Sequence, residues 1–160
     1  MKLVLVWVGR TRDFRWRALE EEYLSRLRKF VAVDVCPVRE SRLRDPLQAQ
    51  GQESQLLESR IPSASAVVAL DERGDQASSQ DFAALLGTLA ARGTRTISFV
   101  MGGPHGLAEG LRVRADQRLA LSRMTWPHEM ARVMVLEQLY RAFSIMRGYP
   151  YHKSAGHGRT

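Results

Sequence analysis

The chain has 160 residues, 44% of them hydrophobic and 26% charged, which is enough to bury the core of one ordinary soluble domain. Lysine and arginine number 24 against 17 acidic residues, and the net charge of +7 favours a polyanionic partner, with a merely basic surface as the alternative. No apolar run reaches the roughly 18 residues of a membrane span, and the one cysteine, Cys36, excludes an internal disulfide framework and indicates a reducing cytoplasm. Cys36 and the four histidines have no metal-ligand spacing.

The N-terminal half alternates between apolar runs and helical patterns. Residues 2–9, KLVLVWVG, form a continuous apolar run closed by glycine, which predicts a strand buried on both faces. Residues 14–30 predict a helix with Asp13 as its N-cap. The elements expected next are a strand over 31–38, a helix over 46–60 and a strand over 65–74.

The C-terminal half continues this alternation. A helix is predicted over 78–93 with Ser79 as N-cap and Gly93 at its end, followed by the strand TRTISFVMGG, then by a helix within AEGLRVRADQRLALS and a long helix over 128–148. Strands alternating with helices predict an α/β fold with a mainly parallel sheet and helices on both faces. We expect one domain over 1–153 and a flexible tail over 154–160.

Three loops leave the predicted strand ends in the C-terminal half, at 70–74, 102–106 and 121–127. Ligands bind at the carboxyl ends of strands in parallel sheets, so these loops predict one pocket. The loop GGPHG lacks both the dinucleotide GxGxxG pattern and a phosphate-loop lysine. It is either a tight turn or a place where exposed amides contact a flat, polar ligand. LSRMTW is either a nucleoside wall or a helix–loop–helix turn with Met124 and Trp126 in the core.

The last predicted helix has a wide apolar surface, which indicates that it packs on the sheet and on something else, such as a second subunit. Glu137 and Arg141 are four residues apart and predict a surface ion pair. Arg132 is interpreted as a solvated charge or a phosphate contact. The segment Tyr151-His152-Lys153 is either a loose terminus or the source of a histidine that assists proton transfer.

Several segments together resemble one known family. FVMGGPHGL, LSRMTWPHEMARVMVLEQLYRAFSIMRG and PYHK follow one another at the C-terminal end, and KLVLVWVG, EEYLSRL and VVALDERG occupy the first half. In this order they resemble the RlmH (YbeA-type) family, which comprises SPOUT-class 23S rRNA pseudouridine N3-methyltransferases. The resemblance spans nearly the whole chain and is weakest at 38–62. Two features depart from the pattern. His105 stands where relatives often carry an acidic or small polar residue, and seven residues follow Lys153 where relatives usually end.

The resemblance implies a SPOUT fold with a deep C-terminal trefoil knot, although knots are essentially absent from ordinary topologies. It also implies a homodimer and the cofactor S-adenosylmethionine, with no metal. Carried over residue by residue, the cofactor contacts fall on the knot loops, at Leu70, Gly102, Leu121, Ser122, Arg123, Met124, Thr125 and Trp126.

The implied substrate is a pseudouridine in helix 69, the subunit-interface stem-loop of 23S rRNA, within the assembled ribosome. The N3 proton must leave, so most of the rate should come from positioning and a smaller part from acid–base help. The implied catalytic residues are His152, Tyr151, Arg141, Glu137 and Lys153, with the tail reaching the partner subunit's pocket. The alternatives are a SPOUT enzyme with another RNA target and a noncatalytic ribosome-binding module.

Overall fold

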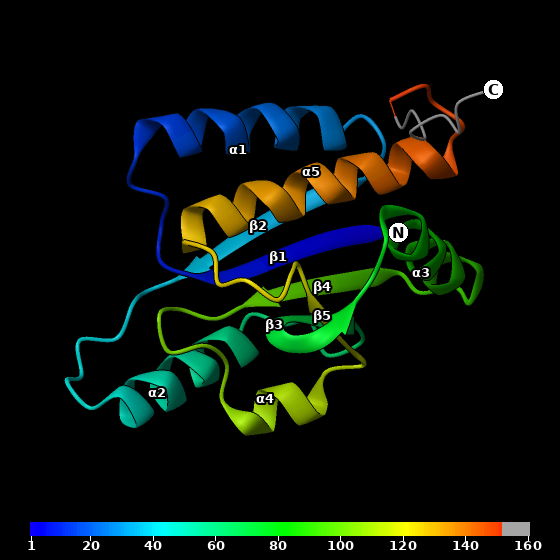
Figure 1. Ribbon diagram of the computed structural model, residues 1–160. Coiled ribbons are helices and arrows are strands. Elements are labelled where there is room, and N and C mark those ends of the chain that lie inside the picture. The colour runs from blue at the N-terminus through cyan, green and yellow to red at the C-terminus, as the bar shows by residue number, and fades with distance from the viewer. Residues whose placement is uncertain (152–160) are drawn as a thin grey trace.

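A computed structural model describes residues 1–151 of the chain, and its centre is a parallel sheet. The five strands lie in the order β2-β1-β4-β3-β5, and every neighbouring pair is parallel (Figure 1). Their bounds are β1 Lys2–Val8, β2 Ala32–Val38, β3 Ala66–Gln76, β4 Thr96–Met101 and β5 Gln117–Ala120. The predicted α/β class with a mainly parallel sheet is therefore confirmed.

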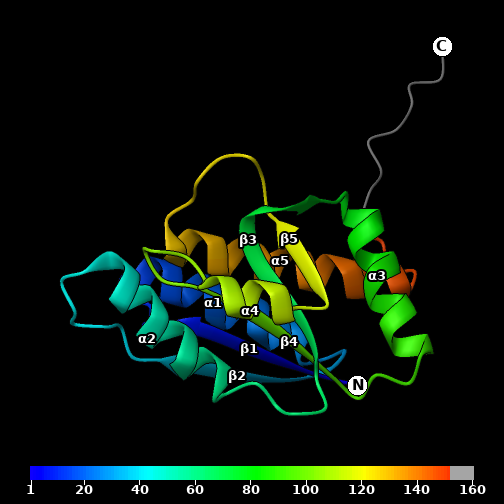
Figure 2. The same cartoon turned by 90° about the horizontal axis from the view of Figure 1, so that it is seen from below.

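Helices cover both faces of this sheet, as expected for parallel strands joined by crossovers. They are α1 Phe14–Leu27, α2 Pro46–Glu58, α3 Ser79–Ala91, α4 Glu109–Arg114 and α5 His128–Met146. Figures 1 and 2 show α1 and α5 side by side on one face and α2 and α4 on the other. The helix α5 also packs against α3, so α1, α3 and α5 share one core.

The side chains of strand β1 show why the sheet needs a layer of helices on each face. Leu3, Leu5 and Trp7 belong to the core beneath α1, α3 and α5, whereas Val4, Val6 and Val8 belong to the core beneath α2 and α4. Side chains alternate along a strand, so an apolar residue at every position requires an apolar layer on each side. The unbroken run KLVLVWV therefore predicts a central strand, and β1 lies between β2 and β4.

The predicted helix ends are right in two places and wrong in one. Asp13 caps α1 by accepting the Arg15 N–H at 2.8 Å, and Gly93 follows α3 with a φ of 79°. The N-cap of α3 is Ser78 and not Ser79, because Asp81 completes a capping box with Ser78. The Ser79 hydroxyl instead donates to Oε1 of Gln138 at 2.7 Å and so joins α3 to α5.

The sequence prediction missed strand β5 inside the segment assigned to a single helix. The segment holds the six-residue helix α4 and then four residues, QRLA, of which only the last is fully buried. An edge strand this short has no clear alternation, so pairing with β3 decides its structure. The register shifts between Leu70 and Asp75, and both of these residues pair with Leu119, so the residues between them form an irregularity in β3 that packs against β5.

The wide apolar surface of α5 finds its partners within the chain. Leu136, Leu139 and Phe143 are buried in the core shared with α1 and α3, and the ring of Tyr140 lies 5.8 Å from that of Phe30. The two neighbouring helices therefore account for much of this surface without a second subunit. Among the described residues, no helix is long and apolar enough to cross a membrane, and no group of three or more candidate metal ligands is present.

We expect Leu139→Ala to lower the free energy of unfolding by about 2–5 kcal/mol, because the side chain is fully buried and its loss leaves a cavity. Urea unfolding measures this change. Leu47→Ala is the matched control, since Leu47 is 75% exposed, and it should change the stability by less than about 0.5 kcal/mol. Equal losses in the two variants would contradict the assigned core.

Candidate functional site

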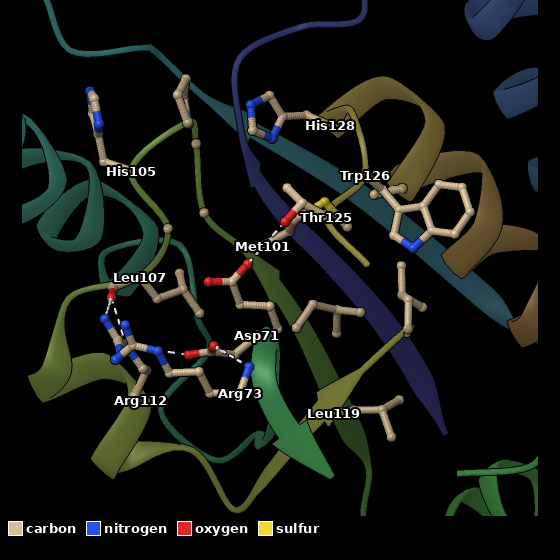
Figure 3. Close-up of a pocket in the computed structure, with 18 of the residues that line it drawn as sticks. Asp71, Arg73, Met101, His105, Leu107, Arg112, Leu119, Thr125, Trp126 and His128 are labelled. Carbon is tan, nitrogen blue, oxygen red and sulfur yellow. Dashed lines mark hydrogen bonds and ion pairs between the residues drawn. The ribbon is translucent and has the colours of Figure 1, made fainter. Parts of the chain in front are cut away.

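A pocket of about 310 Å³ opens at the carboxyl ends of β3 and β4 (Figure 3). The three loops predicted to meet do line it together, with additional side chains from α2, α4 and α5. Its walls combine apolar side chains, such as Leu70 and Leu119, with glycine backbone and small polar groups. Residues that are 50 positions apart in the chain meet here because parallel strands end at the same edge.

The glycine loop after β4 folds back on itself. The Gly106 N–H donates to the Gly103 carbonyl at 2.9 Å, and Gly106 has a φ of 72°, which side chains disfavour. A Cβ on Gly102 would lie 2.5 Å from the Gly106 carbonyl carbon. The turn thus requires glycine for its own closure, and its main chain forms one wall of the pocket.

An arginine from α4 ties the first two loops together. The Arg112 guanidinium lies 3.3 Å from Oδ2 of Asp71, and its Nε donates to the Leu107 carbonyl at 2.8 Å. Both charged side chains are largely buried, at 14% and 9% exposure, and Arg112 also pairs with the exposed Glu109 at 3.5 Å. Figure 3 shows this contact at the base of the pocket. Arg112 therefore fixes the separation of the two loops.

The third loop is organised around one hydroxyl. Oγ of Ser122 accepts the Met124 N–H at 2.8 Å and the indole N–H of Trp126 at 2.9 Å. Thr125 donates to Glu72 of the first loop at 3.4 Å. Met124 is 72% exposed and Trp126 is half-buried, so the alternative that placed both in the core is wrong.

His128, the first residue of α5, and His105 of the glycine loop both line the same pocket (Figure 3). Burial lowers the pKa of His128, and the positive charge of Arg132 lowers it further. The ring is therefore neutral over more of the physiological pH range than an ordinary histidine. A neutral imidazole can accept a hydrogen bond from a ligand in this pocket.

Arg132 anchors the start of α5 to the end of β1. It is only 3% exposed, donates to Oγ1 of Thr11 at 2.9 Å and to the Val8 carbonyl, and lies over the Trp7 ring. The interpretation of Arg132 as a solvated charge or phosphate contact is therefore wrong. Burial raises the pKa of Glu20, the residue that accepts the Thr11 hydroxyl.

The proposed catalytic residues lie elsewhere in the chain. Glu137 accepts the Arg141 Nε–H at 2.9 Å and the Tyr151 hydroxyl at 3.1 Å, and the Arg141 guanidinium covers the Tyr151 ring. The predicted pair of Glu137 and Arg141 is thus confirmed. Burial, with Tyr23 and Glu137 nearby, raises the pKa of Tyr151 and so disfavours ionisation of this phenol further. His152 and Lys153 lie outside the described residues.

This second group is remote from the pocket within one chain. Glu137 and Arg141 follow His128 in α5 by 9 and 13 residues, which corresponds to about 14 and 20 Å along the helix at about 1.5 Å per residue. The helix begins at the pocket and runs back toward the opposite edge of the sheet, where Tyr151 follows its end (Figure 1). None of Glu137, Arg141 and Tyr151 lines the pocket of its own chain.

The structure places most of the predicted cofactor contacts together. The predicted residues that line the pocket are Leu70, Gly102, Leu121, Ser122, Met124, Thr125 and Trp126, whereas Arg123 is exposed and does not line it. Sequence reasoning missed Arg112 and His128. The position of His128 directly after LSRMTWP could have indicated that it lines the pocket. No sequence signal indicated the same for Arg112, because its partner Asp71 is distant in the chain.

Comparisons with known proteins agree with this architecture. A family model described as "Predicted SPOUT methyltransferase" matches residues 1–152. A Geobacter metallireducens protein named ribosomal RNA large subunit methyltransferase H is 40% identical over 154 residues, covering 96% of this chain and all of the relative. A protein of the same name from Anaeromyxobacter sp. is 42% identical with the same coverage.

A solved structure shares the fold at low sequence identity. It is described as a probable methylase family protein from Haemophilus influenzae Rd KW20 and is 13% identical, with a TM-score of 0.57 over 95% of this chain and 70% of the other. The family match along nearly the whole sequence and the pocket formed by three loops support the same assignment. The chain therefore belongs to the SPOUT methyltransferase family, within the group that contains ribosomal RNA large subunit methyltransferase H.

Proposed function

We propose that the chain is an S-adenosylmethionine-dependent methyltransferase that modifies N3 of a pseudouridine in helix 69 of 23S rRNA, within assembled ribosomes in the cytoplasm. One observation carries the proposal: the loop pocket at the carboxyl edge of the sheet occurs in a chain that matches rRNA methyltransferases along their whole length. The net charge of +7 supports an RNA substrate.

The pocket residues fit the proposed cofactor. A cavity of about 310 Å³ lies at the small end of the range of ligand pockets. Leu70 and Leu121 offer apolar contact for a base, and the Gly102 main chain lines the pocket in a turn that a side chain at this position would disrupt. Bound there, the cofactor would supply a methyl group on a sulfonium, which needs no metal for activation. Arg123 is left out of the set because it is exposed and does not line the cavity.

The remaining chemistry is to orient the base and remove its N3 proton. Tyr151 is a hydrogen-bond donor, because its hydroxyl donates to Glu137 at 3.1 Å and its raised pKa disfavours loss of that proton. Glu137 orients Arg141 through the contact at 2.9 Å, and a guanidinium so held would stabilise an anionic base. We propose that His152 takes the proton and that Lys153 assists.

We also propose a homodimer with a composite site. The separation between the pocket and the group at Glu137, Arg141 and Tyr151 supports this arrangement, since a second copy could bring that group to the pocket. Each site would then take its cofactor contacts from one protomer and its tail from the partner. A symmetric dimer repeats this exchange at both pockets.

The loops are further proposed to form a deep trefoil knot. The chain leaves edge strand β5, passes along the first and second pocket loops through residues 121–127, and then crosses the sheet as α5 to pack beside α1 (Figure 2). This path supports threading of the last segment through an earlier loop. It also accounts for the glycines, because crossing segments need close backbone approach.

The central prediction is methyl transfer to ribosomes. Purified protein, labelled S-adenosylmethionine and ribosomes from a strain lacking the modification should give one labelled 3-methylpseudouridine, identified by nucleoside mass spectrometry. Label at another nucleotide would point to a different RNA target. Cofactor binding without transfer, or no cofactor binding at all, would contradict the proposed activity and favour a noncatalytic ribosome-binding module.

Gly102→Ala should weaken cofactor binding by at least about tenfold, because the new Cβ meets backbone that cannot move aside. Isothermal titration calorimetry measures the affinity, and urea unfolding reports whether the fold is retained. Gly87→Ala in α3 is the control, since its Cβ meets nothing within 4 Å and the residue is remote from the pocket. A folded Gly102→Ala protein with wild-type affinity would contradict the site.

Complementation between inactive variants tests the composite site. Gly102→Ala and His152→Ala should each be nearly inactive alone. Co-expression should restore about a quarter of the wild-type rate, because half of the dimers are mixed and each has one complete site. Two differently tagged Gly102→Ala chains serve as the control and should restore nothing. If mixed dimers of the two variants also stay inactive, each tail must serve its own chain.

A further inference from the structure

A second hollow, unlike the pocket, is lined by arginines. It measures about 920 Å³ and lies between the segments that follow β1 and β2. Its lining includes four arginines, Arg10, Arg12, Arg39 and Arg42, against one acidic residue, Glu40. All four arginines are exposed. We call this hollow the arginine groove.

Most of the charge in this groove is uncompensated. Arg12 pairs with Glu40 at 3.3 Å, whereas Arg10, Arg39 and Arg42 have no ion pair among residues 1–151. Exposed guanidinium groups that converge on a hollow attract anions and can contact phosphate with two donors each. The groove therefore has the charge that an extended polyanion would attract, with only one internal ion pair among its arginines in the described part of the chain.

The arginine groove and the pocket share the carboxyl edge of the sheet. Strand β1 pairs with β2 on one side and with β4 on the other, so Val8 stands level with Val38 and Trp7 with Met101. The groove follows the first pair of strands, and the glycine loop of the pocket follows β4. A chain lying in the groove thus ends beside the mouth of the pocket.

One buried carboxylate forms the wall between them. Glu53 is 3% exposed, and its Oε1 accepts the N–H of Ser41, which lines the groove, at 2.9 Å. A Cβ on Gly103 of the pocket would lie 2.7 Å from the other oxygen, Oε2. The groove loop is fixed further by the Ser41 hydroxyl, which donates to Gln52 at 2.7 Å. The groove is therefore held at a set position relative to the pocket.

We propose that the arginine groove binds the phosphate backbone of the RNA substrate next to the nucleotide that is methylated, an inference that rests on the proposed function. Phosphate contacts of this kind position a nucleic acid and carry no sequence information. The groove thus supplies register and affinity, and the pocket supplies the chemistry. RNA held at Arg39 and Arg42 would present a nearby unstacked base across Glu53 to the pocket.

The test compares two double variants that remove the same charge. Arg39→Gln/Arg42→Gln alters the groove, whereas Arg92→Gln/Arg95→Gln alters exposed arginines at the opposite, amino edge of the sheet. Binding to unmodified ribosomes is measured by sedimentation over a range of salt concentrations. The groove variant should bind roughly tenfold or more weakly, with a salt slope smaller by about one for each lost contact. The control should match the wild type.

Further readouts separate this proposal from the proposed function. S-adenosylmethionine binding and thermal stability should be unchanged in the groove variant, and the KM for ribosomes should rise while kcat stays near the wild-type value. If the wild type transfers no methyl group but only the groove variant loses ribosome binding, the groove stands and the methyltransferase proposal falls. If the two double variants bind ribosomes equally well, whether or not both bind more weakly than the wild type, the proposed role of the groove in RNA binding is wrong.

Discussion

The parallel pairing of β1 with both β2 and β4 is the constraint on which the rest of this structure depends. Parallel strands held level end together, so segments from distant parts of the sequence emerge at one edge. The pocket and the arginine groove are two products of that alignment. The central place of β1 also requires apolar side chains on both of its faces, because a strand in the middle of a parallel sheet contacts helices on both sides.

The pocket keeps its shape through a few specific contacts rather than through a large core. Arg112 joins the first two loops, Ser122 organises the third, and Gly102 allows the turn to close against Gly106. The Arg112 contacts join two segments, whereas the Ser122 and Gly102 contacts each close a single loop. Loops fixed in this way can present main-chain groups to a ligand without reorganising, which reduces the entropic cost of binding.

Helix α5 connects the two ends of the functional arrangement. Its first residue, His128, lines the pocket, Arg132 anchors it beneath β1, and its later part carries Glu137 and Arg141 with Tyr151. A rigid helix of this length keeps the two groups apart within one chain. That separation supports the proposal that a second protomer supplies the proposed catalytic groups. The arginine groove is the surface that we propose for RNA on each protomer.

The sequence by itself determined the α/β class, the burial of the run KLVLVWV on both faces, the Asp13 cap and the convergence of three loops, because these follow from local periodicity and from the geometry of parallel strands. Its motifs also indicated the family. Only the tertiary structure revealed strand β5, the burial of Arg132 and the Arg112 contact, and it separated Tyr151 from the pocket. The physical reason is that pairing with β3, desolvation and ion pairing all depend on partners far away in the chain, which no local pattern records.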